Sequence, residues 1–160
     1  MKKIYILLFI LTSINSSSQN YISPFDFPLY LSGTFGELRD HHFHTGIDVK
    51  TNAEEGKNLR AIADGYISRI KVSTWGYGKV LYIVHPQTGH TSVYAHMQKF
   101  NTEIEKVIKE QQYKKESFEI NYYPKKNSLI VKQGDIIGLS GNSGGSGGPH
   151  LHFEIRDTKT

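Results

Sequence analysis

The sequence contains no cysteine and no hydrophobic run long enough to span a bilayer. The absence of cysteine excludes a disulfide framework and a lipid-modified N-terminal cysteine. The apolar stretch at residues 4–11 falls far short of the roughly 20 residues that a transmembrane helix requires. Stability must therefore come from a hydrophobic core, and a bound metal is a candidate for a further stabilising contribution. At 160 residues, the chain is long enough for one such core and one domain.

The sequence also lacks a dense basic stretch, so we expect no nucleic-acid partner. The formal net charge is +4, and Lys2 and Lys3 belong to a predicted leader, so the mature domain carries +4 − 2 = +2. This mild charge permits an anionic wall polymer as a partner without demanding one.

The N-terminus has the order of a secretory signal. A basic start is followed by the apolar residues 4–11 and then by the small residues 16–18. We predict a signal peptide over residues 1–18, cleaved near Ser18, and therefore an exported protein without stable membrane insertion after cleavage. The compartment would be the periplasm, the cell envelope or the extracellular space. The alternatives are an uncleaved anchor or a buried strand.

The body of the chain shows short strand-like runs separated by turn residues, which predicts an all-β domain. Residues 19–32 form an extended lead-in, and Asp64-Gly65 is a hairpin signal between the first two predicted strands. The predicted strands are 59–63, 66–72, 79–85, 91–95, 136–140 and 150–156.

Residues 102–115 have apolar side chains at helical spacing, which predicts a surface helix. Residues 117–123 resemble a further strand, so 100–128 is interpreted as an insertion within the β domain. The chain stops at Thr160, soon after the last predicted strand. Either a short tail closes the domain, or the sequence is a fragment of a longer protein.

The glycine-rich segment 141–148 has the composition of a flexible linker. Only a dozen residues follow it, however, and strand-like runs flank it on both sides. A tight loop beside a functional site is therefore the favoured interpretation, because glycine allows positive φ and close approach of the backbone to a ligand.

The run directly after this loop alternates in polarity. In a strand, His150, His152 and Glu154 would point to one face, while Leu151 and Phe153 would anchor the other face to the core. Two histidines at this spacing suit a metal ligand beside a proton-transfer group. The helical HExxH motif of the zincins is absent. Glu154 is therefore interpreted as a partner of a site residue or a surface residue, not as a general base.

Two further segments carry histidines. His44 and Asp48 face the same side of an extended segment, and the alternation of residues 92–97 places Tyr94 and His96 on one face. Catalytic zinc commonly takes three protein ligands from histidine and carboxylate side chains. His44, Asp48 and one of His150 or His152 would make such a set.

Taken together, these segments resemble the lysostaphin-type (LytM-like) zinc endopeptidases, which cut peptide bridges of bacterial peptidoglycan. The matching blocks occur in family order and cover most of residues 33–156. They are FHTGIDV (43–49), ADGYISRI (63–70), YGKVLYIVH (77–85), SVYAHM (92–97), VKQGDIIGLSGNSG (131–144) and GPHLHFEI (148–155).

The resemblance implies a peptidase domain over residues 33–160, with an antiparallel β fold of the duplicated hybrid or barrel-sandwich type and a helical insertion. It implies one zinc ion bound by His44, Asp48 and His152, and it makes His96 and His150 the two catalytic histidines. Which of these two is the principal base stays open, and His150 is favoured because it neighbours His152. The implied partner is a peptidoglycan peptide.

The insertion lengthens the link from His96 to Val131 beyond what compact members need, and it is a candidate for reshaping or covering the substrate groove. The chain also stops earlier than family members usually do. The bond that is cut stays open between a glycine bridge and a D-alanine-containing cross-link. Two other functions compete: a non-catalytic LytM-like module that binds the wall or regulates hydrolases, and an assembly part of a longer envelope protein.

Overall fold

The computed structural model describes residues 20–40 and 42–159, so the predicted signal peptide lies outside the described residues. The elements are β1 (Leu31–Gly33), β2 (Ile47–Lys50), β3 (Asn58–Arg60), β4 (Gly65–Val72), β5 (Val80–His85), β6 (His90–Ala95), β7 (Lys99–Phe100), α1 (Thr102–Lys115), β8 (Ile120–Tyr122), β9 (Ile130–Val131), β10 (Ile136–Leu139) and β11 (His150–Asp157). Within the described ranges, no helix has both the length and the apolar character needed to cross a membrane.

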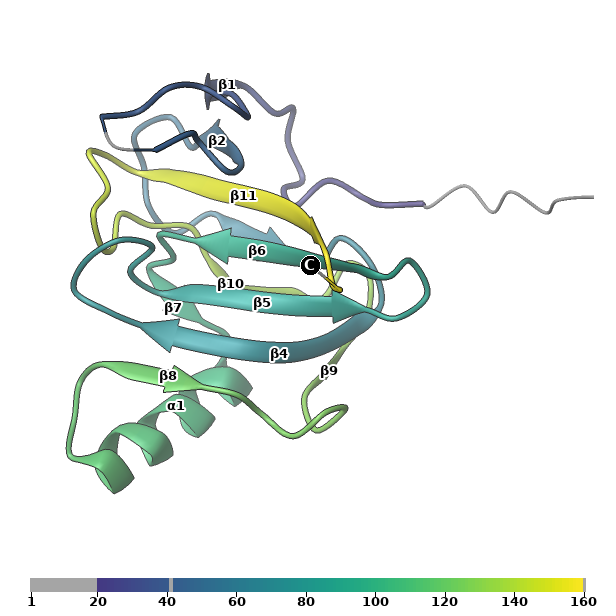
Figure 1. Cartoon of the computed structure of the whole chain (residues 1–160), viewed down its shortest axis with the longest axis vertical. Helices are drawn as coiled ribbons and strands as arrows, with labels where there is room; N and C mark the ends of the chain where they lie inside the picture. Colours follow the sequence, from purple (N-terminus) through teal and green to yellow (C-terminus); the bar gives the residue numbers. More distant parts are fainter. Residues whose placement is uncertain (1–19, 41, 160) are drawn as a thin grey trace, which may run out of the picture.

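The strands form two antiparallel sheets, which confirms the predicted all-β fold (Figure 1). The larger sheet has the order β1-β2-β11-β6-β5-β4-β8, with β9 also paired to β4, and the smaller sheet has the order β3-β10-β7. One hydrophobic core joins them, because Leu59 and Ile137 of the small sheet belong to the same buried cluster as Leu81 and Leu151 of the large sheet. Burying side chains of this size contributes roughly 1.5–3 kcal/mol each.

The predicted hairpin at Asp64-Gly65 is wrong. β3 pairs with β10 of the small sheet, not with β4. The Asp64 carboxylate instead accepts a hydrogen bond of 2.8 Å from the backbone N–H of Gln133, and the side chain of Lys132 pairs with it at 3.1 Å. The chain does turn at Asp64-Gly65, but this turn connects β3 and β4, which belong to two different sheets.

The predicted helix is confirmed as α1, and its sequence explains both ends. Asn101 caps the N-terminus by accepting a hydrogen bond of 3.0 Å from the backbone N–H of Ile104. Glu116 ends the helix in the left-handed conformation. The apolar spacing buries Ile104 and Ile108 against the core, and the other residues of α1 are exposed or half-buried, so α1 is a surface helix that packs on the domain by one face.

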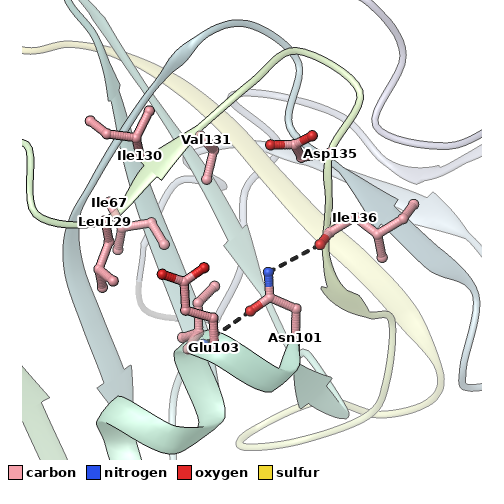
Figure 2. A pocket seen from close by; sticks show the side chains of 9 residues that line it. Ile67, Asn101, Glu103, Leu129, Ile130, Val131, Asp135 and Ile136 are labelled. Atoms are coloured by element: carbon pink, nitrogen blue, oxygen red, sulfur yellow. Dashed lines mark hydrogen bonds between the residues drawn. The ribbon is translucent and has the colours of Figure 1, made fainter.

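Asn101 also ties the helix to the small sheet. Figure 2 shows its side chain donating to the backbone carbonyl of Ile136, at 3.1 Å, beside a hollow of about 190 Å³ at the helix start. Ile67, Leu129 and Val131 line this hollow. In Figure 1, α1 and β8 lie at the opposite end of the molecule from β1 and β2.

Candidate metal centre and active site

The register of β2 and β11 brings the polar residues of two distant segments together. His152 lies directly opposite Asp48, and His150 lies directly opposite Lys50. Residues paired in this way project to the same face of an antiparallel sheet. The predicted shared face of His150 and His152 is therefore observed, and Leu151 and Phe153 are buried on the other side.

Three side chains converge at this face. His44 Nε2 lies 3.1 Å from Asp48 Oδ1 and 2.9 Å from His152 Nδ1, and His152 Nδ1 lies 3.0 Å from Asp48 Oδ1. All three residues are buried. Each offers one ligand atom, and the three atoms lie within 4.8 Å of one another, as a single metal ion requires.

In His44 and His152, one ring nitrogen faces the cluster (the inner nitrogen) and the other faces away from it (the outer nitrogen). The hydrogen-bond partner of the outer nitrogen determines whether the inner one carries a proton. His44 Nδ1 lies 2.8 Å from the carbonyl oxygen of Thr34, and His152 Nε2 lies 2.8 Å from Glu154 Oε1. Both partners only accept, so these outer nitrogens carry the protons and the inner nitrogens of the neutral rings carry lone pairs.

This arrangement fits a divalent cation. Two imidazole lone pairs and one carboxylate oxygen face each other about 3 Å apart, and none of the three atoms carries a proton. These electron-rich atoms repel one another unless a cation or an added proton lies between them. Two nitrogens and one oxygen form a donor set that zinc takes in proteins. Burial disfavours the charged form of Asp48, but the contacts of its carboxylate with the His150 and His152 imidazoles outweigh this effect and hold its pKa well below the usual range.

Glu154 stands directly behind His152. It is 2 % exposed and accepts hydrogen bonds from His152, Thr45, Tyr77 and Arg156. Burial opposes its ionisation, but these donors together lower the pKa of Glu154 to about 2. Glu154 is therefore a buried anion that fixes the orientation of His152. The interpretation of Glu154 as a partner of a site residue agrees with this contact, and a purely surface position does not.

His96 enters the site from the end of β6. Its backbone has a φ of 57°, which is uncommon for a residue other than glycine, and its Nδ1 lies 2.9 Å from the carbonyl oxygen of Ser143. Burial lowers the pKa of His96 to about 4, so the ring is neutral near pH 7. Its centroid lies 4.7 Å from that of His150.

The predicted shared face of Tyr94 and His96 is wrong. Tyr94 is fully buried in the core, where its hydroxyl accepts a hydrogen bond of 3.0 Å from the backbone N–H of Ile62. β6 ends at Ala95, and the positive φ of His96 reverses the alternation, which turns the imidazole toward the site.

The glycine-rich segment 141–148 is a fixed loop beside the site, as predicted. The hydroxyl of Ser143 donates to the carbonyl oxygen of Met97 at 2.7 Å and accepts from the backbone N–H of Lys79 at 2.9 Å. Gly144 has a φ of 77°, and a Cβ there would collide with the backbone of Gly78. Glycine is thus required where the loop packs on the 76–78 turn.

A hollow of about 750 Å³ lies over the converging side chains, and all five predicted site residues line it. The other lining residues are Leu38, Arg39, Asp40, His42, Thr45, Gly76, Tyr77, Gly145, Ser146 and Gly147. None of the residues that line it lies in the 100–128 insertion. The expectation that the insertion covers the groove is therefore not met in this structure.

Three further residues at the site have no role indicated by sequence patterns: Arg39, Tyr77 and Thr45. Arg39 Nη2 donates to Asp48 Oδ2 at 2.9 Å, the carboxylate oxygen that does not face His152, and it lies 3.4 Å from His44 Nδ1. Tyr77 and Thr45 both bond to Glu154 and link it to the turn at 76–78 and to the segment that carries His44. No spacing rule marks these residues, because their partners lie on other strands.

Comparison with known proteins gives consistent matches. A family model described as peptidase family M23 matches residues 42–115 and 118–160. DD-carboxypeptidase/endopeptidase Mpg of Neisseria meningitidis is 33% identical over 119 residues, which are 74% of this chain and 21% of that protein. Glycyl-glycine endopeptidase ALE-1 of Staphylococcus capitis is 32% identical over 111 residues, which are 69% of this chain and 24% of that protein.

Murein hydrolase activator EnvC of Escherichia coli is also similar, at 32% identity over 106 residues, 65% of this chain and 19% of that protein. The chain thus spans about a fifth of the length of the curated relatives it matches. Among solved structures, a zinc-containing peptidase from Vibrio cholerae has a TM-score of 0.60 at 25% identity, over 84% of this chain and 36% of that one. A mutant catalytic domain of the prophage-encoded M23 protein EnpA from Enterococcus faecalis has a TM-score of 0.58 at 25% identity, over 83% of this chain and 84% of that one.

Proposed function

This chain belongs to peptidase family M23, and from that premise we propose that it is an exported zinc endopeptidase that hydrolyses peptide cross-links of bacterial peptidoglycan. The observation that carries the proposal is the convergence of His44, Asp48 and His152, with His96 and His150 beside them. Similarity to relatives named as endopeptidases supports the reaction, and the signal-like N-terminus supports export.

His44, Asp48 and His152 would hold one zinc ion. When bound there, the ion supplies a Lewis acid that polarises a carbonyl and makes a water molecule more acidic. The protein's own contribution is orientation. The Thr34 carbonyl and the Glu154 carboxylate hold the two imidazoles so that their lone pairs face inward, and Arg39 holds the far oxygen of Asp48.

His150 is suited to take the proton from the attacking water. Its Nδ1 lies 2.8 Å from the carbonyl oxygen of Gly148, which leaves Nε2 as the basic atom, 3.5 Å from Asp48 Oδ1. Burial lowers the pKa of His150, but Asp48 raises it by more, because the carboxylate stabilises the imidazolium. The proton then passes to the leaving amine as the C–N bond breaks.

His96 has a complementary role. Its Nδ1–H is given to Ser143, so its Nε2 is the atom left for the substrate. A neutral imidazole in this place accepts a hydrogen bond from the water or the leaving amine, and once protonated it donates to the carbonyl oxygen. We retain the preference for His150 as the principal base and assign His96 to the second position.

The proposal predicts different losses for two neighbouring histidines. In the zinc-loaded full chain, His152→Ala should lose zinc and activity together, because it removes a ligand. His150→Ala should keep zinc and lose peptide release from purified cell walls by at least about 100-fold, as expected for loss of a general base. Zinc is measured by metal analysis after dialysis. No release by the wild type, or equal release by His152→Ala, would contradict the proposal.

The second candidate is a non-catalytic module that binds the wall or regulates hydrolases. The similarity to the activator EnvC favours it. Against it, all five residues with a proposed role in chemistry are present and lie around one hollow. A zinc titration separates the two functions, because the peptidase requires one equivalent of tightly bound metal and the regulator does not.

A further inference from the structure

The active-site hollow continues into a second hollow of about 380 Å³ on the far side of His150. The two share Arg39, Asp48, Gly147 and His150 among their lining residues. The two hollows therefore adjoin, and a substrate lying across the proposed metal centre would extend toward the second one. The other residues that line the second hollow, Lys50 and Asn52 among them, have no role in the chemistry described above.

The second hollow carries an unpaired positive charge from Lys50. The register places Lys50 opposite His150, on the same face as Asp48 and two residues further along β2. Its side chain is exposed, and among the described residues no acidic group forms an ion pair with it. The one carboxylate that lines the hollow is Asp48, which is already bonded to Arg39 and to the imidazoles.

A rigid turn follows Lys50 and presents a second polar group. Asn52 and Ala53 both have left-handed backbones, with φ of 56° and 58°. The turn is closed by the backbone N–H of Glu54 donating to Thr51 at 3.1 Å, and by the Thr51 hydroxyl donating to Glu54 at 2.6 Å. The exposed Asn52 carboxamide lines the hollow beside Lys50.

We infer that this second hollow is a substrate subsite for a free carboxylate of the peptide, bound by Lys50 and assisted by Asn52. Lys50 lies two residues along the strand from Asp48, about 6.6 Å at the usual rise. An extended peptide covers that distance in about two residues, so the carboxylate belongs within about two residues of the bond that is cut. This inference rests on the proposed peptidase function.

The inference favours one of the two candidate substrates. A bridge made of glycine alone has no side-chain carboxylate to place in the second hollow, whereas acidic stem peptides that flank a D-alanine-containing cross-link do. We therefore expect the protein to prefer the acidic cross-link over oligoglycine. The preference should weaken as salt is added, because the lysine is exposed and salt screens its charge.

The test compares one cross-linked peptide in two forms, with its carboxylates free or converted to carboxamides. Pentaglycine with its C-terminus amidated, which has no carboxylate, is the third substrate. The zinc-loaded wild type should have about tenfold higher kcat/KM for the acid form, the size of one charge-assisted hydrogen bond at an open site. Lys50→Met should remove this preference and leave the amide rate and zinc content unchanged. Lys109→Met, on α1, is the matched control and should behave as the wild type.

Equal rates on the acid and amide forms, a preference that survives in Lys50→Met, or cleavage of pentaglycine alone would overturn the subsite while leaving the peptidase intact. Binding gives a readout that does not need turnover. Fluorescence anisotropy with labelled peptides on zinc-loaded His96→Asn protein should show about tenfold tighter binding of the acid form. Asparagine is chosen because it tolerates the left-handed backbone.

The two proposals fail in different ways. Tighter binding of the acid form without any wall or peptide cleavage by the wild type would support the subsite and contradict the peptidase. Equal binding of both forms would overturn the subsite even if the wild type cleaves walls.

Discussion

Glu154 shows how a single buried charge can set the properties of a metal ligand. It fixes the proton of His152 on Nε2, so that Nδ1 faces the candidate metal centre. A carboxylate in this position also makes the imidazole a stronger ligand. Arg156 compensates the charge from the other side, which allows the anion to be buried.

We therefore predict that Glu154→Gln weakens zinc affinity by about 10–100-fold. Glutamine keeps the size of the side chain but removes its charge, so the fold should survive. The measurement is competition for zinc against a chromophoric chelator, with circular dichroism to verify folding. Glu103→Gln, an exposed change on α1, is the control and should leave the affinity unchanged. An unaltered affinity in Glu154→Gln would show that His152 is oriented by packing alone.

At the scale of elements, α1 is a structural part of the domain and not a cover for the groove. It packs through Ile104 and Ile108, and its N-terminal cap also bonds to the small sheet. The helix and the site thus depend on different contacts, at opposite ends of the large sheet.

Asn101→Ala should lower the free energy of unfolding by about 1–2 kcal/mol, because the cap is lost. Zinc affinity should not change. Asn101→Asp keeps an acceptor for the backbone N–H of Ile104 but loses the donor to Ile136, so it should retain most of the stability. Urea unfolding of the three proteins measures this. If the aspartate variant is as unstable as the alanine variant, the bond to Ile136 and not the cap anchors the helix.

For the whole molecule, stability should fall in mild acid in part because of His85. This buried ring lies 2.9 Å from the carbonyl oxygen of Asp64 through Nδ1 and 2.8 Å from the Ser92 hydroxyl through Nε2. Burial lowers the pKa of His85 below its ordinary value of 6.5, and the bond to Asp64 offsets only part of this effect. The unfolded chain therefore binds a proton more readily than the folded one.

The contribution of His85 is complete above about pH 6.5 and is lost as the pH falls below that value, with a slope of at most about 1.4 kcal/mol per pH unit for one proton. His85→Gln should remove this part of the slope. The check is urea unfolding of both proteins at pH 7.5 and pH 5.5. Equal differences between the two pH values would show that other groups account for the whole acid sensitivity.

Local patterns in the sequence predicted local structure well and long-range partners poorly. The spacing of Ile104 and Ile108 fixed the helix, since a helix depends on residues three and four apart. The turn at Asp64 was recognised, but its strands were paired wrongly, because a turn does not specify a partner in another sheet. The face of His96 was wrong because one positive φ at a strand end is invisible to a rule of alternation.

In the candidate site, too, local features were predicted well and long-range partners poorly. The pattern of His150, His152 and Glu154 predicted a common face, because alternation along one strand is local. The pairing of His152 with Asp48, 104 residues earlier, depends on how the sheet is ordered. Donor chemistry left His150 and His152 open as the third ligand beside His44 and Asp48, and only the likeness to a known family selected His152. Arg39 had no signal of either kind, and Tyr77 lay in a block that matches the family but had no role assigned to it.

The position of β11 has a consequence for how the protein is made. Among the described residues, this strand comes after every other strand, yet it lies between β2 and β6 inside the large sheet. Until the ribosome has added residue 152, the two halves of the site have no common strand to hold them together. A growing chain therefore cannot complete the site before β11 has been synthesised and has paired with β2 and β6.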